Sequence, residues 1–366
     1  MKNSFGQNLQ ITLFGESHGP YIGAVLDGLA PGLDVNEDFI RSQLTLRRPV
    51  GAISTGRVEA DEYTIVSGVF NGRTTGTPLC ILIPNTAQRS KDYENAPRIA
   101  RPGHADYAAH CKYHGFEDYR GGGHFSGRIT AGPVAVGAIV IEALRKKGIF
   151  IGTHIERLHD IKDRAFIDLK ADIDKLNASE FAVLDPAAGE NMKKAVEEAA
   201  AVGDSTGGVL ETAVIGLPAG VGEPWFDTVE GLLSHALFGI PAIKGVQFGA
   251  GFDMVNAMGS EFNDPIRNKD GKIVTTTNHN GGINGGITNG MPVIFRCAVK
   301  PTPSIYTEQK SIDINTEENA DLQINGRHDP AIIHRARVVV DSITALVLYD
   351  ILSGRFGTDW FMTENI

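Results

Sequence analysis

A glutamate, a serine and a histidine lie side by side in a short glycine-flanked segment near the start of the chain, Gly15-Glu16-Ser17-His18-Gly19. The spacing Gly-x-Ser-x-Gly also occurs in α/β-hydrolases, in which the nucleophilic serine sits on a sharp turn between a strand and a helix. Here Pro20 and a short strand-like run that ends at Gly28 follow, so the helix that a hydrolase needs is not predicted. We interpret the segment as a tight turn that presents a hydroxyl, a carboxylate and an imidazole together, and we expect His18 to have a chemical role.

A second histidine-containing segment, Arg101-Pro102-Gly103-His104-Ala105-Asp106, places His104 at the expected start of a helix. Further along, His110 and His114 are four residues apart, a spacing that puts two side chains on one face of a helix and can bind a metal ion. No acidic residue stands as an obvious third ligand on that helix, and Gly115 ends it. We therefore expect no metal site here.

Three consecutive glycines stand in the segment Tyr119-Arg120-Gly121-Gly122-Gly123-His124-Phe125-Ser126-Gly127-Arg128, between charged and apolar residues. A long apolar helix is predicted directly after it, at Ala131–Lys147. A glycine loop that leads into a helix N-terminus offers backbone N–H donors and a favourable dipole to a phosphate. A purely structural turn is the alternative for this loop taken alone, and a single Arg-Gly-Gly in an acidic chain does not indicate an RNA-binding tail.

Three cationic segments could bind further anionic groups: Arg47-Arg48-Pro49 at the end of a predicted helix, Lys300-Pro301-Thr302-Pro303-Ser304 after a predicted strand, and Arg327-His328-Asp329-Pro330 before the last predicted helix. Each also has a structural explanation. Positive charge complements the dipole at a helix C-terminus, and Asp329 with Pro330 is typical of a helix start.

The formal net charge is −10 over 366 residues. Such a charge argues against an extended nucleic-acid surface, but a cleft can still carry a local positive potential for a small anion. The three cysteines, Cys80, Cys111 and Cys297, are widely spaced, which predicts free thiols in place of disulfides or a structural zinc site. No apolar run reaches the roughly 20 residues of a membrane span, and Met1–Gln10 lacks the features of a secretory signal. We expect a cytoplasmic protein that binds neither membrane nor nucleic acid.

Hydrophobic periodicity predicts a mixture of strands and helices. Strands are predicted at Gln10–Phe14, Ile22–Leu26, Tyr63–Phe70, Leu79–Ile83, Gly208–Leu217 and Pro292–Val299. Helices are predicted at Asn36–Leu46, Ala131–Lys147, Glu190–Val202, Thr228–Phe238 and Ala331–Leu352. With no sequence repeat and no linker, we expect a single α+β domain over residues 1–366, with a peripheral excursion at 156–190 and a C-terminal tail at 355–366.

Taken together and in this order, these segments resemble the chorismate synthase family along nearly the whole chain. The resemblance extends to Ser67-Gly68-Val69-Phe70, Thr75-Gly76, Asn278-His279 and Gly326 before Arg327. It implies a β-α-β sandwich, a homotetramer, and a lyase that removes phosphate from 5-enolpyruvylshikimate 3-phosphate by anti-1,4-elimination to give chorismate. It also implies reduced FMN that is not net consumed, and NADPH only if the chain reduces its own flavin.

The resemblance further implies a role for individual groups. His18 would act as the acid near the departing phosphate, His104 would protonate or polarise the reduced flavin, and Asp329 would handle the proton at the reactive nitrogen of the flavin. The implied substrate-binding residues are Ser17, Arg47, Arg48, Arg128 and Arg327. The implied cofactor-binding residues are His124, Phe125, Ser126, Pro241, Ala242, Gly285, Lys300, Pro301, Thr302, Pro303, Ser304 and Arg327.

The sequence departs from the family pattern at three places. Many relatives have Arg-Ser-Ser where this chain has His124-Phe125-Ser126, an arginine near Ala52-Ile53 for which Arg57 could compensate, and a glutamate where this chain has Asp341.

Two other functions use similar loops. Another flavin-dependent redox enzyme would need a nicotinamide or electron-partner site, and no dinucleotide fingerprint is present. A non-catalytic protein that binds a phosphorylated ligand would not need the histidines and Asp329.

Overall fold

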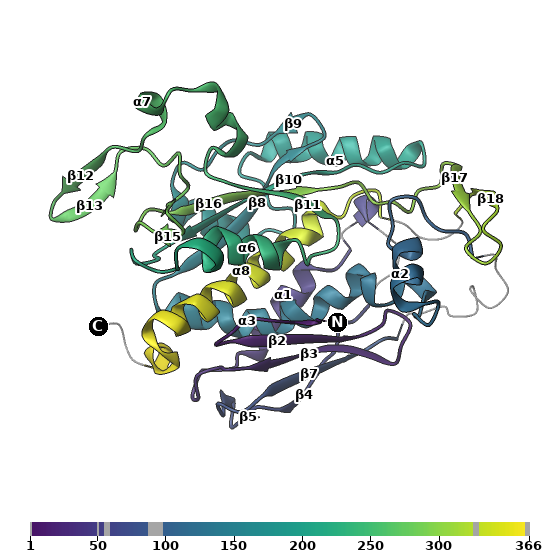
Figure 1. Ribbon diagram of the computed structural model, residues 1–366, viewed down its shortest axis with the longest axis horizontal. Coiled ribbons are helices and arrows are strands. Elements are labelled where there is room, and N and C mark those ends of the chain that lie inside the picture. The colour runs from purple at the N-terminus through teal and green to yellow at the C-terminus, as the bar shows by residue number, and fades with distance from the viewer. Residues whose placement is uncertain (1, 50, 55–58, 87–97, 325–328, 363–366) are drawn as a thin grey trace.

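The computed structural model describes residues 2–49, 51–54, 59–86, 98–324 and 329–362, and it has three layers (Figure 1). Two antiparallel five-stranded sheets lie on either side of a layer of helices. The first sheet has the order β1 (Ser4–Phe5), β2 (Gln10–Gly15), β3 (Tyr21–Asp27), β7 (Leu79–Pro84) and β4 (Thr64–Ser67). The second has the order β11 (Ile243–Phe248), β16 (Val293–Val299), β10 (Gly208–Ile215), β8 (Phe150–Leu158) and β9 (Ile161–Lys162). The predicted α+β fold with a β-α-β sandwich is confirmed.

The middle layer consists of α1 (Glu37–Leu46), α3 (Ala131–Lys146), α6 (Val229–Leu237) and α8 (Ile333–Phe356). Outside the layers lie α2 (Asp106–Tyr113), α4 (Leu169–Asn177), α5 (Pro186–Ala201) and α7 (Gly259–Phe262). Four hairpins complete the described strands: β5 (Val69–Phe70) with β6 (Arg73–Thr74), β12 (Ile266–Lys269) with β13 (Lys272–Thr275), β14 (Ile283–Asn284) with β15 (Ile287–Thr288), and β17 (Gln309–Ile312) with β18 (Asn319–Leu322).

The first sheet buries one face against the helices, as the alternation of its residues predicts. In β7, Leu79, Ile81 and Ile83 are fully buried, whereas the residues between them are partly exposed. Successive side chains of a strand point to opposite faces, so this pattern turns every second residue of β7 toward α3.

Helices α3 and α8 form the centre of the molecule, and their close packing depends on a glycine. A Cβ atom at Gly137 of α3 would lie only 2.6 Å from the Cβ atom of Ser342 of α8. The stretch Arg120–Lys146 is long and apolar enough to span a membrane, but 83% of its most apolar window is buried inside the molecule, as in the core helix of a globular protein.

Two segments that the sequence assigned to the periphery contribute to the core. Residues 156–190 contain the end of β8, the edge strand β9 and helix α4, whose Ile173 packs directly against Gly152 on the outer face of the second sheet. Near the C-terminus, α8 continues to Phe356, and Phe361 is buried with its ring stacked 3.8 Å from that of Tyr349. Residues 355–362 therefore form an ordered end of the helical layer, where we had expected a tail.

Candidate active site

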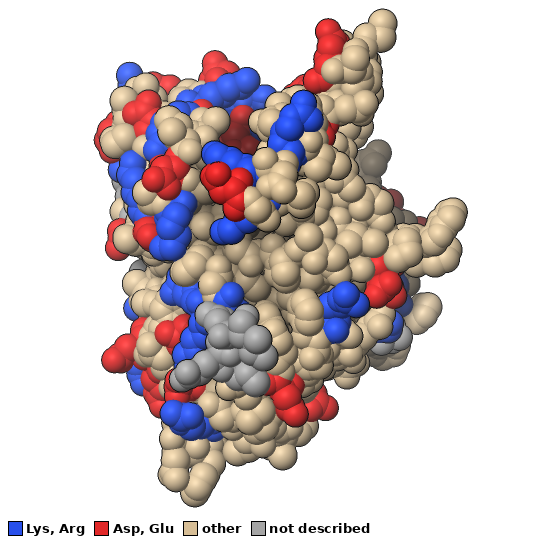
Figure 2. Space-filling model, turned by 90° about the vertical axis from the view of Figure 1, so that its left-hand side faces the viewer, with Lys and Arg blue, Asp and Glu red and all other residues tan. Residues whose placement is uncertain are grey.

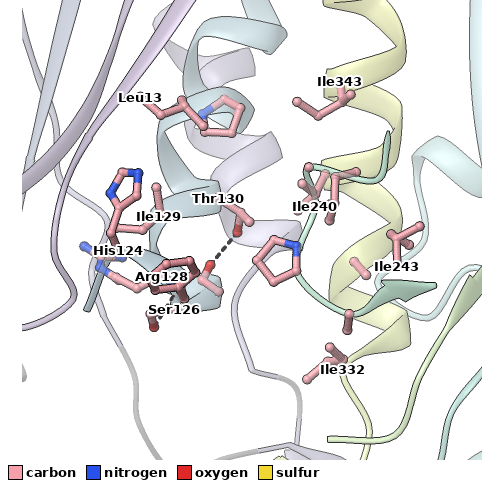
Figure 3. A pocket seen from close by; sticks show the side chains of 18 of the residues that line it. Leu13, His124, Ser126, Arg128, Ile129, Thr130, Ile240, Ile243, Ile332 and Ile343 are labelled. Atoms are coloured by element: carbon pink, nitrogen blue, oxygen red, sulfur yellow. Dashed lines mark hydrogen bonds between the residues drawn. The ribbon is translucent and has the colours of Figure 1, made fainter. Parts of the chain in front are cut away.

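A cavity of about 830 Å³ lies between the start of α3 and the buried helix α8. On one side it is bordered by β2 and the turns η3 (Arg120–Phe125) and η4 (Gly127–Thr130), and on the other by α8 and the loop before β11 (Figure 3). Its volume lies within the roughly 300–1,000 Å³ typical of sites for small molecules and cofactors.

The cavity has an apolar part and a strongly cationic part. The apolar side chains that line it include Leu13, Ile129, Ile240, Ile243, Ile332 and Ile343. Seven described Lys and Arg residues line the cavity, against three described Asp and Glu residues, although the whole chain is acidic. The described lining therefore has an excess of four positive charges, which favours an anionic ligand with a flat or apolar portion.

The three glycines of η3 form a left-handed turn at the edge of the cavity. Gly121 has φ +58°, and a Cβ atom there would lie 2.2 Å from Cε1 of His18. The hydroxyl of Ser17 donates to the carbonyl oxygen of Gly121 at 3.2 Å, and its oxygen lies 3.0 Å from Nδ1 of His18. Among the described residues, Gly121 lines the cavity but Ser17 and His18 do not. These two side chains are buried directly behind the turn.

His104 lies at the cavity wall and is held by a carboxylate. Its Nδ1 is 2.6 Å from Oδ1 of Asp106, which also accepts from Nη2 of Arg101 at 2.8 Å. Burial acts to raise the pKa of Asp106, but the hydrogen bonds from His104 and Arg101 outweigh burial and hold this pKa well below its usual range. The carboxylate is therefore ionised and fixes the imidazole orientation next to Gly122, where a Cβ atom would lie 3.1 Å from Cε1 of His104.

Two buried arginines meet at one carboxylate on the cavity wall. Asp61 accepts a hydrogen bond from Nη2 of Arg47 at 2.8 Å and another from Nη1 of Arg128. Arg128 also donates from Nε to Oδ1 of Asn85 at 2.9 Å. Burial acts to raise the pKa of Asp61, but the charges of Arg47 and Arg128 outweigh it, so the pKa is lowered. The sequence analysis did not identify Asp61.

Asp329 lines the same cavity and is paired with Arg335 of α8. Its Oδ2 accepts from Nη1 of Arg335 at 2.7 Å, and Nε of Arg335 donates to the carbonyl oxygen of Arg47 at 3.0 Å. Arg335 thus connects Asp329 to the segment that carries Arg47. The sequence analysis did not identify Arg335 either, although an arginine within the apolar stretch of α8 is a recognisable signal.

The loop after β16 supplies a third polar wall. Burial lowers the pKa of Lys300, and the nearby charge of Lys244 lowers it further. The hydroxyl oxygen of Thr302 is buried and has no hydrogen-bond partner among the described residues. Arg101 donates from Nη1 to the hydroxyl of Ser304 at 3.5 Å. On the opposite wall, Nδ1 of His124 lies 2.8 Å from the carbonyl oxygen of Gly15, which leaves the other edge of this ring for the cavity.

The structure brings most of the predicted site residues together at this cavity. The predicted residues that line it are Arg47, Arg48, His104, His124, Phe125, Ser126, Arg128, Pro241, Ala242, Lys300, Thr302, Pro303, Ser304 and Asp329. Of the other predicted residues that the structure describes, Ser17 and His18 lie behind the glycine turn, Pro301 does not line the cavity, and Gly285 lies in the hairpin between β14 and β15. Arg327, together with Arg57, lies outside the described residues.

His110 and His114 do not lie on one helix face, although their four-residue spacing allows it. Nδ1 of His110 lies 3.2 Å from Nη1 of Arg98. His114 ends α2 in a left-handed conformation with φ 57°, so it does not continue the helix face that carries His110. In the described part of the chain, no group of three His, Cys, Asp or Glu residues is arranged to hold a metal ion.

Comparison with known proteins identifies what this chain is similar to. The chorismate synthase family model matches residues 9–352. The chain is 42% identical over 351 residues to the chorismate synthase of Thermococcus kodakarensis, covering 96% of this chain and 97% of that protein. It is 46% identical over 353 residues to that of Dehalococcoides mccartyi, covering 96% of each chain. A crystal structure of chorismate synthase matches with a TM-score of 0.76 and 29% identity, covering 99% of this chain and 95% of that one.

Proposed function

Because the chain belongs to the chorismate synthase family, we propose that the cavity between α3 and α8 is its active site and binds the substrate together with reduced FMN. The chain is a lyase. Its reaction is the anti-1,4-elimination of phosphate from 5-enolpyruvylshikimate 3-phosphate, which gives chorismate. The observation that carries the assignment to this cavity is its cationic lining in an acidic chain, since the substrate has two carboxylates and a phosphate.

The lining also fits a flavin with a phosphate tail. An apolar wall suits the ring system. Two buried groups that have no hydrogen-bond partner among the described residues, Nε of Arg47 and the hydroxyl of Thr302, fit a role in binding polar ligand atoms. The left-handed glycine turn lets the backbone approach a ligand closely. When bound, reduced FMN supplies electron density for phosphate departure and recovers it with the hydrogen, so that it is not consumed overall.

Three titratable side chains are assigned to proton handling. His104, oriented by Asp106, faces the cavity as the donor toward the flavin, and Asp329, held by Arg335, accepts a proton there. His18 is assigned to the departing phosphate. Its imidazole lies against Gly121, which lines the cavity, so the glycine turn stands between the imidazole and the cavity. Histidines suit these roles because they change protonation near neutral pH.

The anionic groups of the substrate are assigned to Arg47, Arg48 and Arg128, whose guanidinium groups match carboxylate and phosphate geometry. Ser17 and Arg327 complete the substrate-binding set implied by the family. The cofactor is assigned to His124, Phe125 and Ser126 after the glycine turn, to the loops at 241–242 and 300–304, and to Gly285 and Arg327.

Three broader properties belong to the same proposal: a cytoplasmic location, a homotetramer, and use of NADPH only if the chain reduces its own flavin. The tetramer is supported by large apolar side chains that are strongly exposed, among them Trp225 at 86%, Phe226 at 91% and Phe252 at 79%. Figure 2 shows a face on which a broad uncharged area adjoins charged groups. Exposed apolar surface of this kind is typical of sites of protein contact.

The test is an anaerobic assay of the purified chain with 5-enolpyruvylshikimate 3-phosphate and chemically reduced FMN, in which chorismate and phosphate are both measured. Equal release over many turnovers, with the flavin still reduced, is expected. Net flavin oxidation would indicate another redox enzyme, and flavin binding without product would indicate a different purpose. A repeat with oxidised FMN and NADPH shows whether the chain reduces its own flavin.

A further inference from the structure

Asp61 is a buried carboxylate at the point where two arginines of the cavity wall meet. Its side chain has no exposed surface, and Arg47 and Arg128 are only 5% and 6% exposed. One carboxylate oxygen accepts from Arg47 and the other from Arg128, so each oxygen serves a different guanidinium group. All three residues line the cavity. No role has been assigned to Asp61 in the reaction above.

The backbone of Asp61 is held in an uncommon conformation. Its φ of 52° lies in the left-handed region, which residues other than glycine adopt at a cost, although aspartate and asparagine tolerate it better than most. Such conformations persist where surrounding contacts determine them, and they concentrate at functional sites. The side chain of Asp61 contacts the two arginines, Arg47 and Arg128.

The remaining donors of the two arginines are used unequally. Arg128 donates from Nε to Asn85 and from Nη2 to the carbonyl oxygen of Pro84 at 3.1 Å, so its position is fixed on three sides. Nε of Arg47 is buried and has no hydrogen-bond partner among the described residues. A buried donor at a cavity wall is satisfied when a ligand atom accepts from it. Arg47 is therefore held by Asp61 through Nη2, while its Nε keeps an unused donor beside the cavity that a ligand atom would satisfy.

We propose that Asp61 is a positioning residue for the elimination reaction, which holds the guanidinium groups of Arg47 and Arg128 where they meet one anionic group of the substrate. This proposal deepens the proposed function and rests on it. A positioning role and a purely electrostatic role predict opposite changes in substrate affinity when Asp61 is removed. A negative charge beside two arginines weakens their attraction for an anion, so its removal alone would tighten substrate binding. If Asp61 orients the donors, its removal loosens binding, because directed charge-assisted hydrogen bonds depend on geometry.

The test uses Asp61→Asn in the full chain with reduced FMN. Asparagine has nearly the same volume and tolerates the left-handed backbone, so the change removes mainly the charge and one acceptor. We expect the KM for the phosphorylated substrate to rise by about ten-fold or more, as loss of a well-directed hydrogen bond to a charged group does, with a smaller fall in kcat. A KM that is unchanged or lower would overturn the proposal.

A second variant covers the case in which loss of the buried charge prevents folding. Asp61→Glu keeps the charge but moves the carboxylate by one methylene group, and we expect it to fold and to raise KM. Wild-type KM in this variant would show that the place of the carboxylate does not matter, and would also overturn the proposal.

The matched control is Asp34→Asn. Asp34 also meets two cations, Lys146 and Arg73, but it is exposed and does not line the cavity, so wild-type kinetics are expected.

Calorimetric titration with inorganic phosphate separates this proposal from the proposed function. If the wild type binds phosphate but does not turn over, the assigned activity fails, and a weaker affinity in Asp61→Asn still supports the positioning role. Equal phosphate affinity in the two proteins would count against it.

Discussion

Asp106 holds His104, the histidine for which we propose a role in proton transfer. It binds Nδ1 of His104 and the guanidinium group of Arg101, and all the contacts lie between 2.6 and 3.0 Å. We predict that Asp106→Asn lowers kcat by roughly ten-fold or more, as loss of an orienting carboxylate does for histidines in metal sites. Steady-state kinetics over a range of pH measure this, because the imidazole no longer has a fixed partner for Nδ1–H. Asp174→Asn, which removes an exposed partner of Lys170, is the control. Unchanged kcat in Asp106→Asn would show that His104 does not need this support.

At the residue scale, the sequence predicted many of the polar groups that line the cavity and missed residues that hold them in place. His104, Arg128 and Asp329 stand in motifs whose residue types already indicate chemistry, and each lines the cavity. Asp61 and Arg335 act through partners that are distant in sequence or on another element, and no local pattern reveals such pairs. The position of His18 behind Gly121 depends on the left-handed turn, which three glycines permit but do not specify.

At the scale of elements, the predicted strands and helices follow the observed ones closely where alternation or helical periodicity is clear, as in β7 and α3. Strand β8 was missed. Its inward-facing Thr153 and outward-facing His154 are both polar and both fully buried, so the strand lacks the simple alternation of apolar and polar residues. Thr153 is hydrogen-bonded to Asp341 of α8, and His154 to Glu211 of β10. A strand is not predicted from alternation when its buried residues are polar and find their hydrogen-bond partners on other elements.

The contacts of His154 with Asp163 and Glu211 make the stability of the second sheet depend on pH. Burial acts to lower the pKa of His154, but hydrogen bonds to Asp163 at 2.7 Å and to Glu211 at 3.1 Å outweigh it, and the pKa is raised. A raised pKa means that this contribution to stability is fully present below the unfolded value of about 6.5 and is lost as the pH rises through the folded value. The pKa values of both carboxyls are lowered, so their contribution is lost as the pH falls below about 4.

We predict that His154→Gln destabilises the protein by roughly 3 kcal/mol at pH 6, because it removes the cation that contacts the buried carboxylates of Asp163 and Glu211, although Glu211 keeps its second partner, Arg296. The difference in free energy of unfolding from wild type should shrink as the pH rises above the folded pKa of His154. Denaturant unfolding at several pH values measures it. The control is His159→Gln, whose imidazole pairs with Asp160 on the exposed surface. A constant difference across the alkaline range would mean that His154 is not charged in the fold.

At the scale of the whole molecule, charge is separated between surface and cavity. The chain has a formal net charge of −10, yet its described cavity lining has four more cationic than anionic side chains. Net charge read from the sequence argues against an extended nucleic-acid surface but leaves room for a small anion. The tertiary fold collects the arginines of four separate segments around one cavity.

The proposed homotetramer makes a prediction at this same scale. Trp225 and Phe226 of η5 (Trp225–Asp227) are 86% and 91% exposed, and burying two such side chains between subunits would stabilise association. We predict that the double variant Trp225→Glu with Phe226→Glu sediments as a smaller species than the wild type, because a charge buried at a subunit contact is costly. Sedimentation velocity at several concentrations measures the change. Ile167→Glu, at a residue 82% exposed in the segment before α4, is the matched control and should leave the assembly unchanged. A double variant that sediments as the wild-type tetramer would place the subunit contacts on another face, and a wild type that sediments as a monomer would remove the tetramer from the proposal.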